Sequence, residues 1–222
     1  MDEITRQEKE RSVWNKLAAG YDARSLQMFK EAYELSIQEA CAVLSAQDRV
    51  LEIGCGTGII ALGIATCAKT VVATDISPEM ISVAQGKAAS QGISNVSFHT
   101  HDGYSLPYES QSFDAVLLFN VLHFVKEPSS ILQEAHRLLK PSGTLVSATD
   151  CYAEPAPIPT RLKLGLQRLL NWVGVIPFAW YYKKEDLHVL FEEHGFSIAE
   201  TEELHTDPVN YYVCAQKKAP RP

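Results

Sequence analysis

The chain of 222 residues has no run of about 18 consecutive apolar residues, so no membrane-spanning helix is expected. Its first residues, Met1 to Arg6, are acidic and polar and lack the apolar core of a secretory signal peptide. Its five cysteines are scattered, and no two of them have the CxxC spacing. This pattern predicts free thiols in a reducing cytoplasm and no metal site.

Positive charge is also in short supply. Lys and Arg number 20 against 27 Asp and Glu, which gives a formal net charge of −7 and a pI near 5.5. This balance does not indicate a basic face for nucleic acid, and no nucleic-acid partner is expected. Internal repeats and low-complexity linkers are absent, and the length suits a single domain with a sizeable core.

Strand-like and helix-like segments alternate through the middle of the chain. The strand-like runs are Val50–Ile53, Thr70–Thr74, Val96–His99, Asp114–Phe119 and Thr144–Ala148. Helices are expected between them over Gly58–Ala68, Ser77–Gln91 and Ser129–Leu139, with a turn at Lys140–Gly143 before the last strand. This alternation predicts a parallel, doubly wound α/β sheet with its ligand crevice at the carboxyl ends of the strands.

The flanking segments follow other patterns. Helices are expected over Thr5–Ala19, Ser25–Leu44, Thr160–Trp172 and Lys184–His194. Phe196–Glu203 and Asn210–Gln216 alternate like a terminal antiparallel pair.

A glycine-rich turn follows the first strand, in Glu52-Ile53-Gly54-Cys55-Gly56-Thr57-Gly58. Glycine is needed where the backbone takes a positive φ or comes close to a ligand, and the helix that follows presents unpaired amides. Asp75 ends the next strand, where a carboxylate can accept both hydroxyls of a ribose. The pattern predicts an adenosine-containing ligand.

The identity of that ligand depends on what the turn lacks. A phosphate-binding P-loop needs the pattern G-x-x-x-x-G-K-[ST], and the turn has neither its Lys nor its Ser. Compared with the dinucleotide fingerprint G-x-G-x-x-G, the last glycine comes one residue early, and Ile59 stands where it belongs. Glu52 places an acid near the ligand, which is unfavourable for a pyrophosphate and favourable for a cation.

The turn resembles motif I, E-x-G-x-G-x-G, of the class I S-adenosylmethionine-dependent methyltransferases. The resemblance extends from about Trp14 to Gln216, and the Leu122-His123 pair is similar to that of ubiquinone- and menaquinone-biosynthesis-type enzymes. It implies a Rossmann-like, seven-stranded sheet, mostly parallel with an antiparallel last strand and helices on both faces. It also implies S-adenosylmethionine as cofactor and S-adenosylhomocysteine as product.

The resemblance assigns the cofactor contacts. Gly54, Cys55 and Gly56 lie under the methionine and ribose, Asp75 holds the ribose, and Ile76 packs on the adenine. Asp102 accepts the adenine amine, next to the amide of Gly103 or Tyr104. Asn120 and Val121 contact the methionine end, and Tyr21, within a W-x-x-x-A-x-x-Y-D segment that begins at Trp14, belongs to a lid. The remaining expected contacts are Glu52, Gly58 and Met80. Simpler alternatives are a helix cap for Asp75, a turn aspartate for Asp102 and a core aromatic for Tyr21.

His123 is the one candidate for catalysis, as a base near neutral pH that takes a proton from the acceptor. The alternative is a structural histidine.

The expected division of the single domain, 1–222, is a helical lid over 1–45, a cofactor-binding core over 46–151, a helical cap over 152–183, and a final helix and strand pair over 184–222.

The cap is rich in apolar and aromatic residues, which favours a small, lipophilic or aromatic acceptor methylated by in-line displacement. Its basic residues, Arg161, Lys163, Arg168, Lys183 and Lys184, form a solvated helix face or contact an acidic acceptor or a membrane surface. Two other functions stay open: a binding module that senses S-adenosylmethionine without turnover, and an NAD-dependent oxidoreductase. The sequence is compatible with a monomer or a homodimer.

Overall fold

The computed structural model describes residues 3–172, 176 and 178–219. Seven strands form one sheet in the order β3-β2-β1-β4-β5-β7-β6. The strands are β1 (Arg49–Ile53), β2 (Thr70–Asp75), β3 (Val96–Thr100), β4 (Phe113–Phe119), β5 (Leu139–Asp150), β6 (Phe196–Thr206) and β7 (Val209–Lys217). Only β7 is antiparallel to its neighbours, β5 and β6. The expected mostly parallel sheet with an antiparallel last strand is confirmed.

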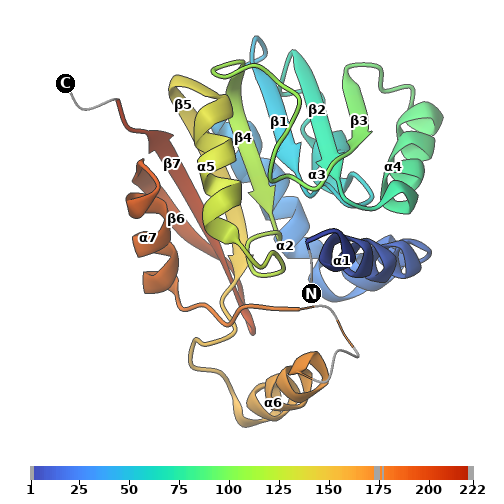
Figure 1. The fold of residues 1–222 in the computed structure, drawn as a ribbon, viewed down its shortest axis with the longest axis vertical. Coiled ribbons are helices and arrows are strands. Elements are labelled where there is room, and N and C mark those ends of the chain that lie inside the picture. Colours follow the sequence, from blue (N-terminus) through green and yellow to red (C-terminus); the bar gives the residue numbers. More distant parts are fainter. Residues whose placement is uncertain (1–2, 173–175, 177, 220–222) are drawn as a thin grey trace.

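The helices are α1 (Glu3–Ala18), α2 (Tyr21–Val43), α3 (Ile59–Gly63), α4 (Pro78–Gln91), α5 (Pro128–Leu138), α6 (Ile158–Trp172) and α7 (Lys184–Glu193). Five of them cover the sheet: α2, α3 and α4 pack on one face, and α5 and α7 on the other. Figure 1 shows α1 and α6 toward the carboxyl end of β4, with α6 standing apart from the two helical layers.

Alternation along the central strands explains the two apolar cores. In β4, Leu117 faces the core under α2, α3 and α4, whereas Val116 and Leu118 face the core under α5 and α7. Successive side chains of a strand point to opposite faces, so a strand covered on both sides is apolar throughout. This arrangement fixes the carboxyl ends of β1, β2 and β4 side by side.

Two expected boundaries are wrong. The helix expected over Gly58–Ala68 ends at Gly63, because the next turns are closed by shorter bonds, from the Ala65 amide to the Leu62 carbonyl and from Cys67 to Ile64. The turn expected at Lys140–Gly143 is part of β5, which begins at Leu139 and pairs with Phe113 across an irregularity in register. Other elements lie within a few residues of their expected positions.

The expectation of free thiols throughout is also wrong. Cys41, near the end of α2, and Cys67, after α3, form a disulfide with a Cα–Cα distance of 5.5 Å. The other three cysteines, Cys55, Cys151 and Cys214, are free and buried. Disulfides are rare in reducing compartments, so the cysteine-based argument for a cytoplasmic location fails.

Two properties of the described part of the chain bear on its partners. No helix within residues 3–172 or 178–219 combines the length and the apolar character needed to cross a membrane. Across the same residues, no group of three His, Cys, Asp or Glu side chains is arranged to hold a metal ion.

Candidate active site

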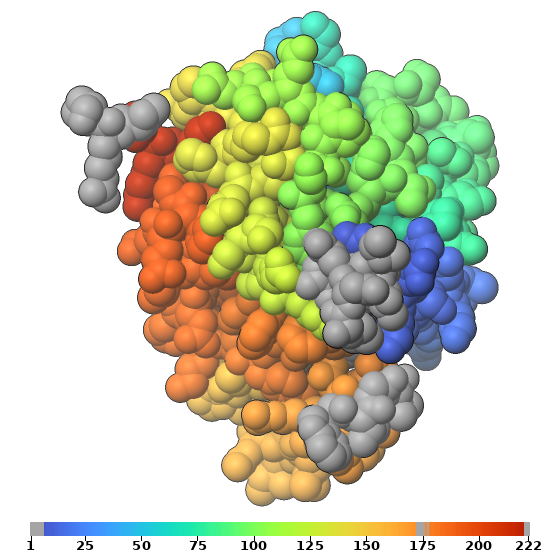
Figure 2. Space-filling model, viewed as in Figure 1, coloured from blue at the N-terminus to red at the C-terminus, as the bar shows by residue number. Residues whose placement is uncertain are grey.

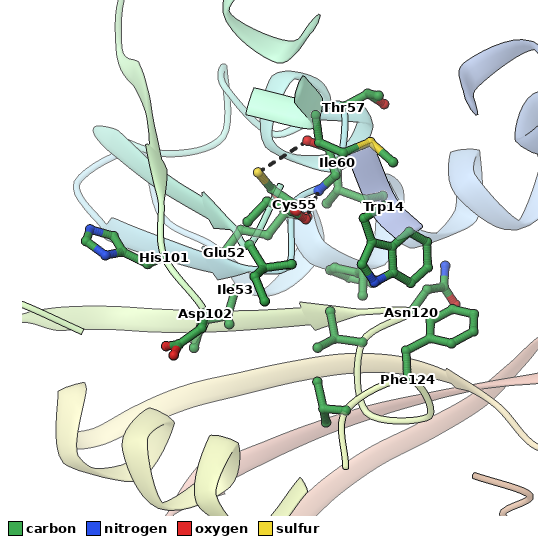
Figure 3. A pocket seen from close by; sticks show the side chains of 18 of the residues that line it. Trp14, Glu52, Ile53, Cys55, Thr57, Ile60, His101, Asp102, Asn120 and Phe124 are labelled. Carbon is green, nitrogen blue, oxygen red and sulfur yellow. Dashed lines mark hydrogen bonds between the residues drawn. The ribbon is translucent and has the colours of Figure 1, made fainter. Parts of the chain in front are cut away.

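A pocket with about 950 Å³ of empty space, its mouth included, opens at the carboxyl ends of β1, β2 and β4. Figure 3 shows His101 and Asp102 at one end and Trp14, Asn120 and Phe124 at the other, with Glu52 and Ile53 between them. Twelve of the fourteen expected cofactor-contact residues line it: Tyr21, Glu52, Gly54, Cys55, Gly56, Asp75, Ile76, Met80, Asp102, Tyr104, Asn120 and Val121.

The glycine turn forms the floor of this pocket. Gly54, Gly56 and Gly58 all have positive φ, at 76°, 53° and 78°. A Cβ on Gly54 would stand 2.3 Å from the Val121 Cγ2 atom, so the loop after β4 packs against bare backbone here. A Cβ on Gly56 would meet no atom within 4 Å, so this position needs glycine for its backbone angle and leaves room above it.

Gly58 and Gly103 are the two expected contacts that do not line the pocket. A Cβ on Gly58 would stand 3.0 Å from Ala84 and Phe98, and one on Gly103 would stand 2.6 Å from the Ile53 side chain. Both glycines therefore serve close packing behind the pocket wall.

Asp75 both shapes the turn and faces the pocket. Its Oδ2 accepts a hydrogen bond from the Gly56 amide and its Oδ1 accepts one from the Ser77 amide, each at 2.8 Å. Ser77 in turn caps α4 by accepting from the Met80 amide at 3.1 Å. Burial raises the pKa of Asp75, and the two amide donors oppose that rise. A carboxylate oxygen can accept more than one hydrogen bond, so both oxygens retain capacity for a ligand.

Glu52 is a buried acid with an unused oxygen. Its side chain is 1% exposed, and its Oε2 has no hydrogen-bond partner among the described residues. Burial, with the nearby Asp75 charge, raises the pKa of Glu52 to about 8. A buried carboxyl group with one oxygen left without a partner favours a cationic ligand, which would restore the charged form.

Asp102 lies at the far end of the pocket under the first helix. Its Oδ1 accepts from the Tyr104 amide at 3.1 Å, and its Oδ2 accepts from the Gln7 Nε2 at 2.7 Å. The hydrogen bond to the Tyr104 amide is the one that a turn aspartate would make. The position of Asp102 in the pocket wall is the one that a ligand-binding residue would have. Gln7 was not among the residues expected at the site, because a polar side chain in the first helix carries no signal of its own.

One face of α1 covers the pocket. Glu10 and Trp14 line it, and the Trp14 ring meets the Phe124 ring edge-on at 5.1 Å. The Glu10 carboxylate lies 3.9 Å from the Lys126 Nζ, and Asn15 accepts from the Ser77 hydroxyl at 2.7 Å. These contacts tie α1 to the loop after β4 and to the start of α4.

The second helix contributes Tyr21 and Tyr33, whose hydroxyls interact with each other. Next to Tyr21, Asp22 accepts hydrogen bonds from the Thr57 hydroxyl and from the Lys87 Nζ. These bonds hold the start of α2 against the glycine turn. Tyr33 was missed at the sequence level because it follows the 3.6-residue apolar period of α2 and looks like an ordinary core residue.

His123 does not line the pocket. Its side chain is completely buried, its Nδ1 accepts from the Asp150 amide at 3.4 Å, and its Nε2 lies 3.8 Å from the Asp150 Oδ2. Burial lowers the pKa of His123, and the Asp150 charge opposes this. The geometry favours a neutral His123 ring whose role is to position Asp150. It does not favour His123 as a base that contacts a substrate directly.

Asp150 is a candidate that the sequence did not single out. It ends β5, and its Oδ1 accepts from the Asn210 Nδ2 at 2.6 Å, while its Oδ2 accepts from the Tyr152 hydroxyl at 2.9 Å. Asn210 also donates to the Asn120 Oδ1, at 2.8 Å, and Asn120 lines the pocket. The signal was available: like Asp75, Asp150 is a carboxylate at the carboxyl end of a parallel strand.

The charge of the pocket distinguishes between ligands. Its described lining includes four carboxyl groups, from Glu10, Glu52, Asp75 and Asp102, and no Lys or Arg. A dinucleotide brings a doubly charged pyrophosphate, which such a lining would repel. The lining fits a cationic ligand and counts against the oxidoreductase hypothesis.

Comparisons with known proteins agree with this geometry. Residues 51–147 match the family model described as a methyltransferase domain. The chain is 29% identical over 189 residues to the demethylmenaquinone methyltransferase of Tropheryma whipplei (strain Twist), covering 82% of this chain and 77% of that protein. It is 36% identical over 157 residues to the demethylmenaquinone methyltransferase of Clavibacter sepedonicus, covering 68% of this chain and 63% of that protein.

The chain belongs to the class I S-adenosylmethionine-dependent methyltransferases. A solved S-adenosylmethionine-dependent methyltransferase from Methanosarcina mazei superposes with a TM-score of 0.66 at 25% identity, covering 82% of this chain and 98% of that one. The cofactor of the protein described here is therefore S-adenosylmethionine, and the residues that line its pocket fit that cofactor. The Glu52 oxygen that has no partner among the described residues, and a lining whose carboxyl groups are accompanied by no Lys or Arg, suit a sulfonium and an ammonium, and the Gly56 position leaves room for a ligand.

Proposed function

We propose that the protein transfers the methyl group of S-adenosylmethionine to a small, lipophilic or aromatic acceptor. The observation that carries this proposal is the set of aromatic side chains in the pocket lining: Trp14 and Phe124, whose rings are in contact, and Tyr21 and Tyr33, whose hydroxyls interact. A mostly apolar pocket with few polar groups suits a small apolar ligand. The names of two relatives, both demethylmenaquinone methyltransferases, support an acceptor of the quinol type.

The cofactor would be held by the acidic side of the pocket. Asp75 would accept the ribose hydroxyls, Asp102 the adenine amine, and Glu52 would balance the positive charge. Each is already fixed by its strand or its backbone bonds, so little ordering is required on binding. When bound, S-adenosylmethionine supplies an electrophilic methyl group on a sulfonium that leaves as a neutral thioether.

The chain would contribute mainly alignment and exclusion of water. In-line displacement needs the acceptor atom about 3 Å from the methyl carbon, in a site that limits access of water. The Trp14–Phe124 contact and the Glu10–Lys126 ion pair close α1 over this end of the pocket. These contacts support a lid role for the segment 1–45.

Asp150 is the residue that we favour for handling the proton of an acceptor hydroxyl. Its carboxylate is 20% exposed and bonds to the Tyr152 hydroxyl, and its charge acts on Tyr33 in the pocket wall. His123 would act through Asp150, because its Nδ1 accepts a hydrogen bond and its Nε2 therefore carries the proton that faces the Asp150 Oδ2.

The acceptor would enter beside α6. A second pocket lies between the loop at 152–156 and the inner side of α6, and Tyr152 and Tyr181 line it. Their rings lie 5.5 Å apart, and the Tyr152 ring also meets the His123 ring edge-on at 5.6 Å. Tyr152 thus connects this second pocket with Asp150, which is joined through Asn210 to Asn120 in the wall of the first pocket, and this supports a cap role for 152–183.

A product assay tests the proposal. The protein is incubated with methyl-labelled S-adenosylmethionine and a panel of phenols, quinols, thiols and amines, with the Asp75→Ala variant as a low-affinity control. We expect a labelled phenol or quinol product and an equal amount of S-adenosylhomocysteine. Thermal stabilisation by S-adenosylmethionine without product from any acceptor would instead favour the binding module.

A further inference from the structure

The outward face of α6 is apolar. Ile158, Leu162, Leu166 and Leu169 are 71%, 71%, 58% and 54% exposed. Their spacing of four, four and three residues places them on one stripe of the helix. Figure 2 shows α6, in gold, at the lower end of the molecule.

Cations border this stripe on both sides. At about 100° per residue, Arg161 and Arg168 fall together on one side of the stripe and Lys163 on the other. All three are exposed, and the sequence of α6 contains no Asp or Glu. A concentration of positive charge next to exposed apolar side chains is notable in a chain whose net charge is −7.

The opposite side of α6 is attached to the rest of the protein. Thr160 donates to the Asp207 carboxylate at 2.9 Å, and Tyr181 donates to the Leu164 carbonyl at 3.4 Å. At the edge between the two sides, the exposed Arg168 has its guanidinium 5.5 Å from the centre of the Tyr181 ring. Because these contacts hold the inner side, the apolar stripe is directed away from the protein core.

We propose that α6 docks the protein on an anionic lipid surface. The four apolar side chains enter the boundary between headgroups and acyl chains, and Arg161, Lys163 and Arg168 pair with lipid phosphates. A helix with an apolar stripe, a basic polar side and a length of 15 residues lies in the plane of such an interface. The chemistry that recognises the surface is negative headgroup charge combined with accessible acyl chains.

A second copy of the chain fits this face less well. Symmetric pairing of α6 with α6 would bring cations against cations, since the helix has no acid to oppose them. Four side chains are also few for a stable interface, which buries about 800 Å² on each partner. Lipid headgroups supply the complementary charge that self-association lacks.

Docking would place the acceptor entrance beside the membrane. Arg161, Leu164 and Arg168 of α6 also line the second pocket, together with Tyr152. An acceptor dissolved in the bilayer would then have a short path to Asp150. The docking inference does not depend on the acceptor, because it rests on the exposed stripe and its charges.

Vesicle sedimentation tests the inference directly. The full-length protein is mixed with vesicles of phosphatidylcholine alone or with about 30 mol% phosphatidylglycerol, at low salt and at about 0.5 M salt. The test variant is Leu162→Gln/Leu166→Gln. The matched control is Met28→Gln/Val189→Gln, which changes two apolar side chains of 57% and 55% exposure on other helices.

We expect binding to the anionic vesicles, weakened by salt, and little binding to phosphatidylcholine alone. The partition coefficient of the test variant should fall on the order of tenfold, while the control stays near wild type. No binding by the wild type, equal binding to both vesicle types, or a test variant that binds like wild type would overturn the proposal.

Two further measurements keep these outcomes separate. Stabilisation by S-adenosylmethionine in a melting experiment shows that each variant is folded, and it requires no acceptor. Sedimentation velocity detects self-association: a wild-type dimer that the Leu162→Gln/Leu166→Gln change abolishes would overturn lipid docking in favour of a second copy. Failure of methyl transfer would leave the vesicle result unaffected.

Discussion

Glu52 and Asp75 show how neighbouring carboxyl groups in one pocket can differ. Asp75 accepts from two backbone amides, whereas one oxygen of Glu52 has no partner among the described residues. Burial raises the pKa of both groups. Asp75 therefore combines turn stabilisation with ligand binding, and Glu52 depends more on a ligand to satisfy it.

Replacing Glu52 by Gln should change how stability depends on pH. The pKa of Glu52 is about 8 in the folded protein against an ordinary 4.5. Between these values the folded state retains a proton that the unfolded chain has lost, so wild-type stability falls as the pH rises from about 4.5 to about 8. Glutamine cannot ionise, so this loss should disappear, with a gain on the order of 4 kcal/mol at the upper end.

Denaturant unfolding without cofactor across this pH range measures the effect. Wild type and Glu52→Gln should diverge progressively toward pH 8. Two curves that stay parallel would show that Glu52 does not titrate in this window.

Replacing Asp75 by Ala should weaken cofactor binding by roughly 1.5–3 kcal/mol, the range for hydrogen bonds to charged groups. Asp48→Ala is the matched control, because Asp48 also accepts a backbone amide, from Ser45 at 2.8 Å, but lies outside the pocket. Calorimetric titration with S-adenosylmethionine should give a raised Kd for the first variant only. Equal affinities for the two variants would contradict the ribose assignment.

Replacing Asp150 by Asn should affect turnover more than cofactor binding. The amide preserves the shape of the side chain but cannot act as a base, so kcat should fall on the order of 10²-fold if the acceptor arrives protonated. The Kd for S-adenosylmethionine should stay close to wild type, since Asp150 does not line the cofactor pocket. A variant with normal kcat would exclude Asp150 from proton handling.

Among the elements, the central strands and the capped helix α4 could be predicted closely. Their signals are local: apolar runs for the strands, and Ser77, Pro78 and Gly92 at the ends of α4. The early end of α3 was not predictable from its apolar residues, because tertiary packing and shorter turn bonds decide it. The β5 start at Leu139 depends on pairing with Phe113, which only the assembled sheet provides.

The site followed the same division. Most of the expected residues in the glycine motif and at strand ends line the pocket, since their positions follow from the topology. Gly58 and Gly103 lie behind the pocket wall; packing and ligand contact both require glycine, and sequence alone does not separate the two. His123 is surrounded by Phe124, Tyr152 and the backbone at Trp180. Tyr152 and Trp180 are distant from it in sequence, so no local pattern predicts its burial.

The disulfide joins two elements that sequence spacing could not pair. Cys41 and Cys67 are 26 residues apart and link α2 to the loop after α3. A disulfide that closes a loop of this size stabilises a protein by roughly 2–4 kcal/mol. Reductant should therefore lower the Tm of the wild type and leave a Cys41→Ser/Cys67→Ser variant unchanged.

A thiol titration in denaturant checks the same bond. Oxidised wild type should expose only the thiols of Cys55, Cys151 and Cys214. Five reactive thiols before reduction would contradict the disulfide.

At the scale of the whole molecule, charge and shape are divided between two regions. The sheet and its covering helices present an acid-lined pocket, while α6 carries three cations and an exposed apolar stripe. The first region accounts for the cofactor, and the second provides the surface proposed to meet lipid. The loop at 152–156 and Tyr152 lie between them, at the proposed acceptor entrance.

A carboxyl-lined pocket should select a cationic adenosyl cofactor over an anionic dinucleotide, and two parallel titrations can show this. Binding of S-adenosylmethionine and of NADH is measured by calorimetry on the same wild-type protein at about pH 8, where Glu52 is near its pKa. We expect saturable binding of S-adenosylmethionine and at least about 100-fold weaker binding of NADH, because the ionised carboxylates of the lining repel its pyrophosphate and no Lys or Arg of the described lining offsets them. NADH binding as tight as that of S-adenosylmethionine would contradict it.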